Sequence, residues 1–166
     1  MKIDLIKVGD FKANCYLVTK NNKTIIIDPG DEAKKIIDLC KDKNIVGILV
    51  THHHFDHVGA LKEISNEYKL DYNQFPIKGF DFEILKTPGH SEDSLSFYFK
   101  EEKIIFTGDF VFYHTIGRCD LIGSDFKKMK KSIKMLLTYP KDIKIYPGHG
   151  NSTILQEEIS YLEEYL

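Results

Sequence analysis

The chain has 166 residues, with 23 Lys and Arg against 25 Asp and Glu, and 42% of its residues are hydrophobic. This composition excludes disordered and collagen-like classes, and the length is sufficient for one domain with its own core. The net charge of −2 and the pI of about 6.4 disfavour a nucleic-acid partner, because such proteins usually carry a strongly basic domain or stripe. We therefore expect a single domain over residues 1–166 that binds no nucleic acid.

The cysteines and the N-terminal residues bear on the compartment. Cys15, Cys40 and Cys119 are odd in number and far apart, which fits a reducing compartment better than a disulfide framework. Lys2 and Asp4 interrupt the stretch where a signal peptide would be apolar, and no later apolar run approaches the ~20 residues of a membrane span. These features predict a cytoplasmic protein with no membrane partner.

The first half of the chain predicts strands followed by helices. Asn21 and Asn22 are suited to positive φ, so they predict a turn within an antiparallel meander. Apolar residues with helical spacing follow from Ala33 to Cys40, and the next β-branched apolar run predicts a buried strand. The predicted strands are 3–8, 15–19, 24–27 and 45–50, and the predicted helices are 33–40 and about 58–68.

The second half predicts a similar group of strands and helices. Ser124 is the expected N-cap of the first helix in this half. Two facing sheets, each covered on its outside by helices, would bury all the apolar faces. The expected fold class is therefore α/β (α+β), a four-layer αββα sandwich. The predicted strands are 80–85, 95–99, 103–106 and 142–146, and the predicted helices are 126–136 and 155–166.

Four of the seven histidines fall with an aspartate in one short stretch after the strand predicted at 45–50, and three of them form a candidate cluster with that aspartate. In a loop that follows a strand, alternate side chains can converge on one point. Imidazole and carboxylate groups are ligands that suit zinc, iron or manganese. A single histidine is usually structural, whereas this cluster predicts a metal site. Its members are His52, His54, Asp56 and His57.

Further His and Asp residues stand where three later strands end, each beside Gly or Pro. They are His90 in Thr87-Pro88-Gly89-His90, Asp109 in Thr107-Gly108-Asp109 and His149 in Pro147-Gly148-His149-Gly150. Gly and Pro end a strand and can aim the next side chain into a cleft. With the first cluster they supply ligands for two metals that keep open positions for water. Open positions indicate catalysis rather than a structural role.

These motifs, in this order and spacing, resemble the metallo-β-lactamase-fold hydrolases, especially the glyoxalase II (hydroxyacylglutathione hydrolase)-like branch. The likeness extends from Asn14-Cys15-Tyr16 and Ile27-Asp28-Pro29-Gly30 to the C-terminal helix. It implies the metallo-β-lactamase fold, an αββα sandwich, and a binuclear site in which zinc is the first expectation and iron or manganese the alternatives. It implies that one metal is held by His52, His54 and His90, that the other is held by Asp56, His57 and His149, and that Asp109 bridges both.

The function implied is hydrolysis of a small thioester or ester by a hydroxide that bridges the two metals. Two cations roughly 3.5 to 4 Å apart can share a water and lower its pKa to about 7. Asp56, a ligand beside this nucleophile, is the expected proton acceptor. Full-length glutathione thioesterases carry a helical C-terminal domain, whereas this chain has one helix beyond His149, so the resemblance is to the small form.

Two other activities stay open. The segment 116–121 is also similar to a loop of persulfide dioxygenases, in which one iron would be held by His52, His90 and Asp109. A phosphodiesterase or nuclease of the same fold is the other alternative. The complete set of ligands for a second metal favours the hydrolase.

Five further residues are candidates for supporting the site or contacting substrate. Asp28 resembles an aspartate of the family that supports the metal site without being a ligand. Tyr113 and His114 follow the strand that ends at Asp109, in a loop where either could meet substrate. Arg118 and Asp120 are expected to pair with each other and so to rigidify their loop.

Overall fold

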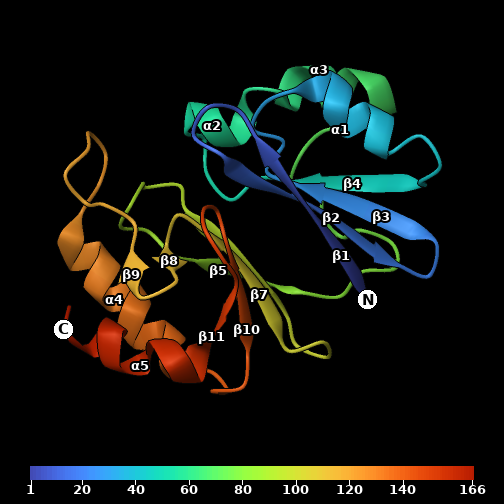
Figure 1. The fold of residues 1–166 in the computed structure, drawn as a ribbon. Helices are drawn as coiled ribbons and strands as arrows, with labels where there is room; N and C mark the ends of the chain where they lie inside the picture. Colours follow the sequence, from blue (N-terminus) through green and yellow to red (C-terminus); the bar gives the residue numbers. More distant parts are fainter. The chain divides into compact units, whose positions relative to one another are not determined.

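Two β-sheets organise the computed structural model, which describes all of residues 1–166 (Figure 1). The chain divides into two compact units, Met1–Asp81 and Phe82–Leu166, and each unit has its own sheet and its own helices. None of the helices combines the length and the apolar character that crossing a bilayer requires.

The first unit is a four-stranded sheet with three helical segments. Its elements are β1 (Lys2–Val8), β2 (Ala13–Lys20), β3 (Lys23–Ile27), α1 (Ala33–Leu39), β4 (Ile45–Leu49), α2 (Phe55–Val58) and α3 (Leu61–Tyr68). The strand order is β1-β2-β3-β4; the first two pairs are antiparallel and β3–β4 is parallel. Asn21 and Asn22 turn the chain at φ 50° and 59°, so the predicted meander and its turn are confirmed.

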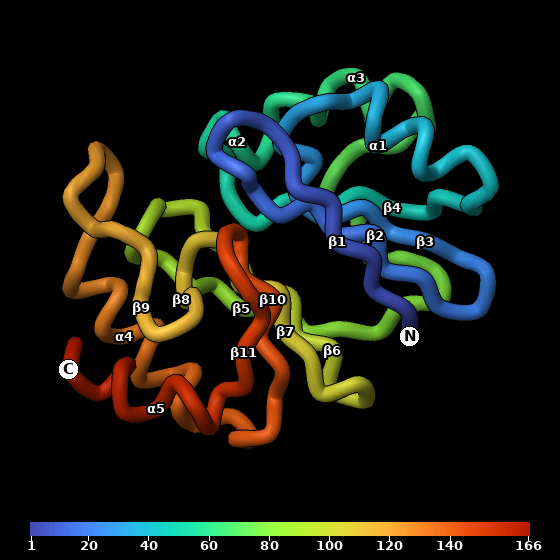
Figure 2. Tube along the Cα trace, viewed as in Figure 1, coloured from blue at the N-terminus to red at the C-terminus, as the bar shows by residue number.

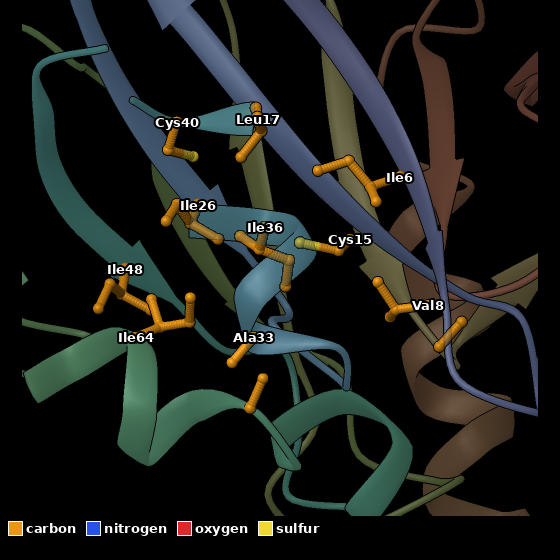
Figure 3. Close-up of a cluster of buried hydrophobic side chains, with 12 residues drawn as sticks. Ile6, Val8, Cys15, Leu17, Ile26, Ala33, Ile36, Cys40, Ile48 and Ile64 are labelled. Atoms are coloured by element: carbon orange, nitrogen blue, oxygen red, sulfur yellow. The ribbon is translucent and has the colours of Figure 1, made fainter. Parts of the chain in front are cut away.

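Helices α1 and α3 cover one face of this sheet (Figure 1). An apolar cluster fills the space between the sheet and these two helices (Figure 3). It consists of alternate side chains of the strands and of the side chains on the helix faces that point toward the sheet. Ile26 and Ile48 come from the sheet, Ile36 from α1 and Ile64 from α3, and all four are fully buried. Burial of each such side chain contributes about 1.5–3 kcal/mol, so this cluster is a main source of the unit's stability.

The single helix predicted at about 58–68 is wrong in one respect, because α2 and α3 are separate helices. Gly59 lies so close to the preceding loop that a Cβ built on it would be 2.4 Å from the carbonyl oxygen of Gly30. The next amide, that of Ala60, donates a hydrogen bond to the carbonyl of Pro29 at 3.0 Å. The chain therefore bends here to pack against residues 29–30, a contact that helical periodicity does not encode.

The second unit is a five-stranded sheet with a small hairpin and two helices. Its elements are β5 (Glu83–Lys86), β6 (Leu95–Phe99), β7 (Ile104–Gly108), β8 (Val111–Phe112), β9 (Thr115–Ile116), α4 (Phe126–Leu136), β10 (Lys144–Pro147), β11 (Thr153–Ile154) and α5 (Leu155–Glu163). The order is β11-β10-β7-β6-β5, with β7 and β10 parallel. A second apolar cluster joins this sheet to its helices; Ile105 and Ile145 come from the strands, Ile133 from α4 and Leu162 from α5.

Two expectations for this unit are corrected. Asp125, not Ser124, is the N-cap of α4, since its Oδ1 accepts hydrogen bonds from the amides of Lys128 and Lys127 at 3.1 and 2.8 Å. These bonds hold the pKa of the Asp125 carboxyl below its usual value. The strand predicted from residue 80 begins at Glu83, because residues 77–80 form a turn closed by a hydrogen bond from the Phe80 amide to the Ile77 carbonyl.

The first core makes a prediction about stability. Ile36 and Leu39 both lie on α1, but Ile36 is 0% exposed and Leu39 is 52% exposed. Ile36→Ala should lower the free energy of unfolding by about 2–5 kcal/mol, because it removes buried methylenes and leaves a cavity. Urea unfolding followed by circular dichroism measures this change. Leu39→Ala is the matched control and should stay close to wild type; equal losses in the two variants would contradict the assigned core.

The burial of the three cysteines predicts how fast each thiol reacts with an alkylating reagent. Burial raises the pKa of the Cys15 and Cys40 thiols, and burial followed by the charges of Asp120 and Asp125 raises that of the partly exposed Cys119. Because the thiolate is the reactive form, iodoacetamide at pH 7.5 should label Cys119 slowly and faster at higher pH. Cys15 and Cys40 should react only after addition of urea. Mass spectrometry locates the label, and rapid labelling of Cys15 in the folded protein would contradict the structure.

Candidate functional site

The first group of predicted site residues follows two parallel strands. Because β3 and β4 run in the same direction, their carboxyl ends lie at the same edge of the sheet. Asp28 comes directly after β3, and Thr51 comes two residues after β4. Asp28 Oδ1 accepts a hydrogen bond from the Thr51 amide and Oδ2 accepts one from the Thr51 hydroxyl, both at 2.7 Å. The two strand ends are thus joined through one carboxylate.

The Asp28 carboxylate also orients a histidine. Its Oδ2 lies 2.9 Å from Nδ1 of His57, and both side chains are buried. Asp28 itself has φ 52°, in the left-handed region that Asp and Asn tolerate better than most residues, so this side chain turns toward Thr51 and His57. A histidine that donates from Nδ1 to a carboxylate presents the lone pair of Nε2, which is the common arrangement of a metal-binding imidazole.

Thr51 orients a second histidine in the same way. Its Oγ1 is 3.1 Å from Nδ1 of His52. Since the single hydroxyl proton is donated to Asp28, Oγ1 acts as an acceptor toward His52, and His52 also presents the lone pair of Nε2.

The four predicted residues of this loop lie together in the first unit. The His52 ring centroid is 4.3 Å from that of His57 and 4.7 Å from that of His54, while His57 Nε2 is 3.9 Å from Asp56 Oδ2. The intervening His53 is instead within hydrogen-bond distance of the Tyr72 hydroxyl, at 3.1 Å.

The second group follows another pair of parallel strands. β7 ends at Gly108 and β10 at Pro147, and the Gly148 amide donates to the Gly108 carbonyl at 2.8 Å. Asp109 and His149 are therefore delivered to the same edge of this sheet. Asp109 Oδ2 lies 3.6 Å from His149 Nε2 and 3.5 Å from His90 Nε2, so one carboxylate oxygen lies near two imidazole nitrogens.

The loop after β9 fixes the orientation of His90. The carbonyl oxygen of Arg118 accepts from His90 Nδ1 at 2.9 Å, which again presents the lone pair of Nε2. Gly117 allows this close approach, since a Cβ there would lie 1.8 Å from the carbonyl oxygen of Asp109. The side chains of Arg118 and Asp120 pair at 2.6 and 2.8 Å, so the contact expected between them is present. This pair also holds the pKa of the Asp120 carboxyl below its usual value.

These donor sets fit metal ions better than a hydrogen-bond network. Distances of 3.5 and 3.6 Å from Asp109 Oδ2 are too long for hydrogen bonds. Two ligands at about 2.0–2.1 Å from one tetrahedral ion are about 3.4 Å apart, which is close to the observed spacing. Three imidazoles with a fixed Nδ1 and a shared carboxylate supply the nitrogen and oxygen donors that zinc, iron or manganese take.

Tyr113 and His114 belong to an aromatic stack. The His114 ring lies between the rings of Tyr113 and Tyr161, with centroid distances of 3.7 and 4.0 Å. The His114 amide donates to the buried Glu158 on α5 at 2.7 Å. The structure thus places both residues against α5, and their contact with substrate stays a prediction.

Two residues with clear structural roles escaped the sequence analysis. Thr51 connects Asp28 to His52, and its position between a strand and the first histidine was the available signal. Glu158 is buried at 0% exposure and also accepts from the Thr153 hydroxyl at 2.6 Å. It stands three residues after Leu155 and four before Leu162, on the apolar stripe of α5, where a carboxylate needs a buried donor.

Comparison with known proteins covers most of the chain. The sequence model of the Metallo-beta-lactamase superfamily matches residues 8–72 and 69–149. Hydroxyacylglutathione hydrolase GloC of Haemophilus influenzae is 32% identical, over 95% of this chain and 95% of its own length.

Solved structures agree with this match. The B3 metallo-beta-lactamase BLEG-1 superposes with a TM-score of 0.90 at 27% identity, over 96% of this chain and 97% of its own. TTHA1623 in a di-iron-bound form superposes with a TM-score of 0.84 at 30% identity, over 94% of this chain and 96% of its own. The predicted fold class is therefore confirmed, with two mixed sheets and their helices.

The Asp28 contacts make a prediction about metal affinity. Asp28→Asn should weaken zinc binding by about 10–100-fold, because His57 loses its charged acceptor and Thr51 loses one of its partners. Competition with a chromophoric chelator measures the affinity, and circular dichroism confirms that the variant is folded. Asp42→Asn, an exposed carboxylate at the other end of β4, is the control. Unchanged affinity in folded Asp28→Asn would show that this carboxylate does not support the ligands.

Proposed function

Because the chain belongs to the metallo-β-lactamase superfamily, we propose that it is a metal-dependent hydrolase that cleaves thioesters or esters of the hydroxyacylglutathione type. The observation that carries this proposal is Asp109 Oδ2, which lies between Nε2 of His90 and Nε2 of His149 at metal-ligand spacing. The name of the GloC relative supports the reaction class, and the di-iron form of TTHA1623 supports a centre with two metals.

We assign the ligands by the chemistry of the two donor sets. One ion would take His52, His54 and His90, the second would take Asp56, His57 and His149, and Asp109 would be shared. The 3.9 Å between His57 Nε2 and Asp56 Oδ2 supports the assignment of these two residues to one ion. Zinc is the proposed metal, with iron supported by the TTHA1623 form. When bound, such a pair of cations polarises a carbonyl group and makes water acidic enough to lose a proton near neutral pH.

The residues of the chain have distinct tasks in this reaction. Asp56 accepts the proton of the attacking water as the oxygen–carbon bond forms, and it returns the proton to the departing thiolate when the carbon–sulfur bond breaks. The products are a carboxylic acid and a thiol. Asp28, Thr51 and the Arg118 carbonyl do not react; they hold the imidazole rings in the orientation that presents Nε2.

The shared carboxylate provides the test. Asp109→Ala should lower kcat for S-lactoylglutathione by about 100-fold or more, because a lost metal contact removes several kcal/mol of transition-state stabilisation and each 1.4 kcal/mol is tenfold. Thiol release with a chromogenic disulfide reports the rate, and elemental analysis reports metal per chain.

Asp142→Ala is the matched control in the same unit, since Asp142 is exposed and pairs with Lys103 on the surface. Full activity of Asp109→Ala with unchanged metal content would contradict the proposed centre. A wild-type protein that carries one iron, hydrolyses no thioester and consumes oxygen with a persulfide would replace the hydrolase by an oxidoreductase.

A further inference from the structure

A pocket in the first unit is lined by Asp56, a proposed metal ligand, and by eight residues that have no part in the proposed metal centre. It measures about 220 Å³ and is bounded by the turn between β1 and β2, the loop after β3 and the helix α2. Figure 2 shows that turn, in dark blue, next to α2. Pockets that enclose a whole drug-sized ligand measure about 300–1,000 Å³, so this one is suited to a single chemical group of a substrate.

Two aromatic rings form the wall of the pocket. Phe11, from the β1–β2 turn, and Phe55, from α2, meet edge to face with centroids 5.3 Å apart. They are 62% and 68% exposed, although each would gain about 1.5–3 kcal/mol from burial. Exposed aromatic surface that is paired inside a pocket is typical of a site that binds apolar ligands.

The pocket is held in shape by the backbone. The Gly9 amide donates to Glu32 Oε2 at 3.1 Å, and Gly9 has φ 64° and packs against the Asp31 side chain. At Gly30, another lining residue, a Cβ would lie 1.8 Å from the carbonyl oxygen of Asp56, so only glycine fits there. A pocket that is already formed costs little conformational entropy when a ligand binds.

The charged residues that line the pocket are all acidic. They are Asp10, Asp31 and Asp56, and none of the lining residues is basic. Lys35 donates hydrogen bonds to Glu32 at 3.1 Å and to the Lys7 carbonyl at 2.8 Å. The acidic lining residues would therefore repel an anionic group that entered the pocket, whereas an uncharged group would not be repelled and would pack against the rings.

We propose that this pocket binds an uncharged aromatic or branched apolar acyl group of the substrate and disfavours acyl groups that carry a carboxylate. This inference rests on the proposed hydrolase, because Asp56 would place the pocket next to the reacting carbonyl. Asp56 is also a proposed metal ligand, so the selection against anions is assigned to Asp10 and Asp31. Phe11 determines the preference for apolar groups.

The first test compares three thioesters that share the neutral carrier N-acetylcysteamine. The value of kcat/KM should be about tenfold higher for the phenylacetyl than for the acetyl thioester, and lowest for the glutaryl thioester. Phe11→Ala should lower kcat/KM for phenylacetyl about tenfold and change acetyl less than twofold. Asp10→Asn with Asp31→Asn should raise kcat/KM for glutaryl several-fold. The controls are Phe126→Ala, an exposed ring on α4, and Asp42→Asn.

The second test measures binding without turnover. The uncharged thioether S-(2-phenylethyl)-N-acetylcysteamine cannot be hydrolysed, and its titration should shift the backbone amides of Gly9, Gly30 and Gly59 in NMR spectra of the purified protein. Phe11→Ala should raise the Kd about tenfold. Shifts confined to other residues, or an unchanged Kd, would overturn the proposal.

The two tests separate the failure of the pocket from the failure of the hydrolase. Hydrolysis of all three thioesters with equal kcat/KM, unaffected by Phe11→Ala, would overturn the pocket and leave the hydrolase in place. Binding of the thioether at Gly9, Gly30 and Gly59 without hydrolysis of any thioester would overturn the hydrolase and support the pocket.

Discussion

The carboxylate of Asp28 is the constraint on which the arrangement of the first unit's donor residues depends. It is 2% exposed and accepts from the Thr51 amide, the Thr51 hydroxyl and His57. A buried carboxylate without such partners would cost several kcal/mol, and these three donors offset that cost. The requirement that stabilises Asp28 therefore also fixes the orientation of the loop that carries the histidines.

Both units bring their candidate site residues together with the same strand arrangement. In each sheet one pair of parallel strands, β3–β4 or β7–β10, ends at a common edge, and the candidate residues follow directly. Antiparallel neighbours would send consecutive strand ends to opposite edges. The group that accepts a hydrogen bond from Nδ1 differs among the three histidines. It is a carboxylate for His57, a hydroxyl for His52 and a backbone carbonyl for His90. The outcome is the same in each, because Nε2 becomes the nitrogen that can bind a cation.

The aromatic pocket shows a different balance between stability and function. Phe11 and Phe55 keep most of their apolar surface exposed, which folding alone does not favour, whereas Ile36 and Ile64 in the same unit are fully buried. Carboxylates beside these rings make the surface selective as well as apolar. The chain would thus combine the proposed hydrolysis with a preference for apolar acyl groups. The β1–β2 turn and α2 would determine that preference.

The sequence by itself determined the features that depend on local pattern. The Asn21-Asn22 turn, the alternation of strand and helix, and the clustering of His and Asp after strands all followed from spacing and residue type. Only the tertiary structure decided features that join distant residues: the contact of Asp28 with His57, 29 positions apart, the division between α2 and α3, and the pairing of Phe11 with Phe55. The physical reason is that periodicity reports which face of an element is apolar, whereas a hydrogen-bond partner or a close backbone contact depends on where the chain returns.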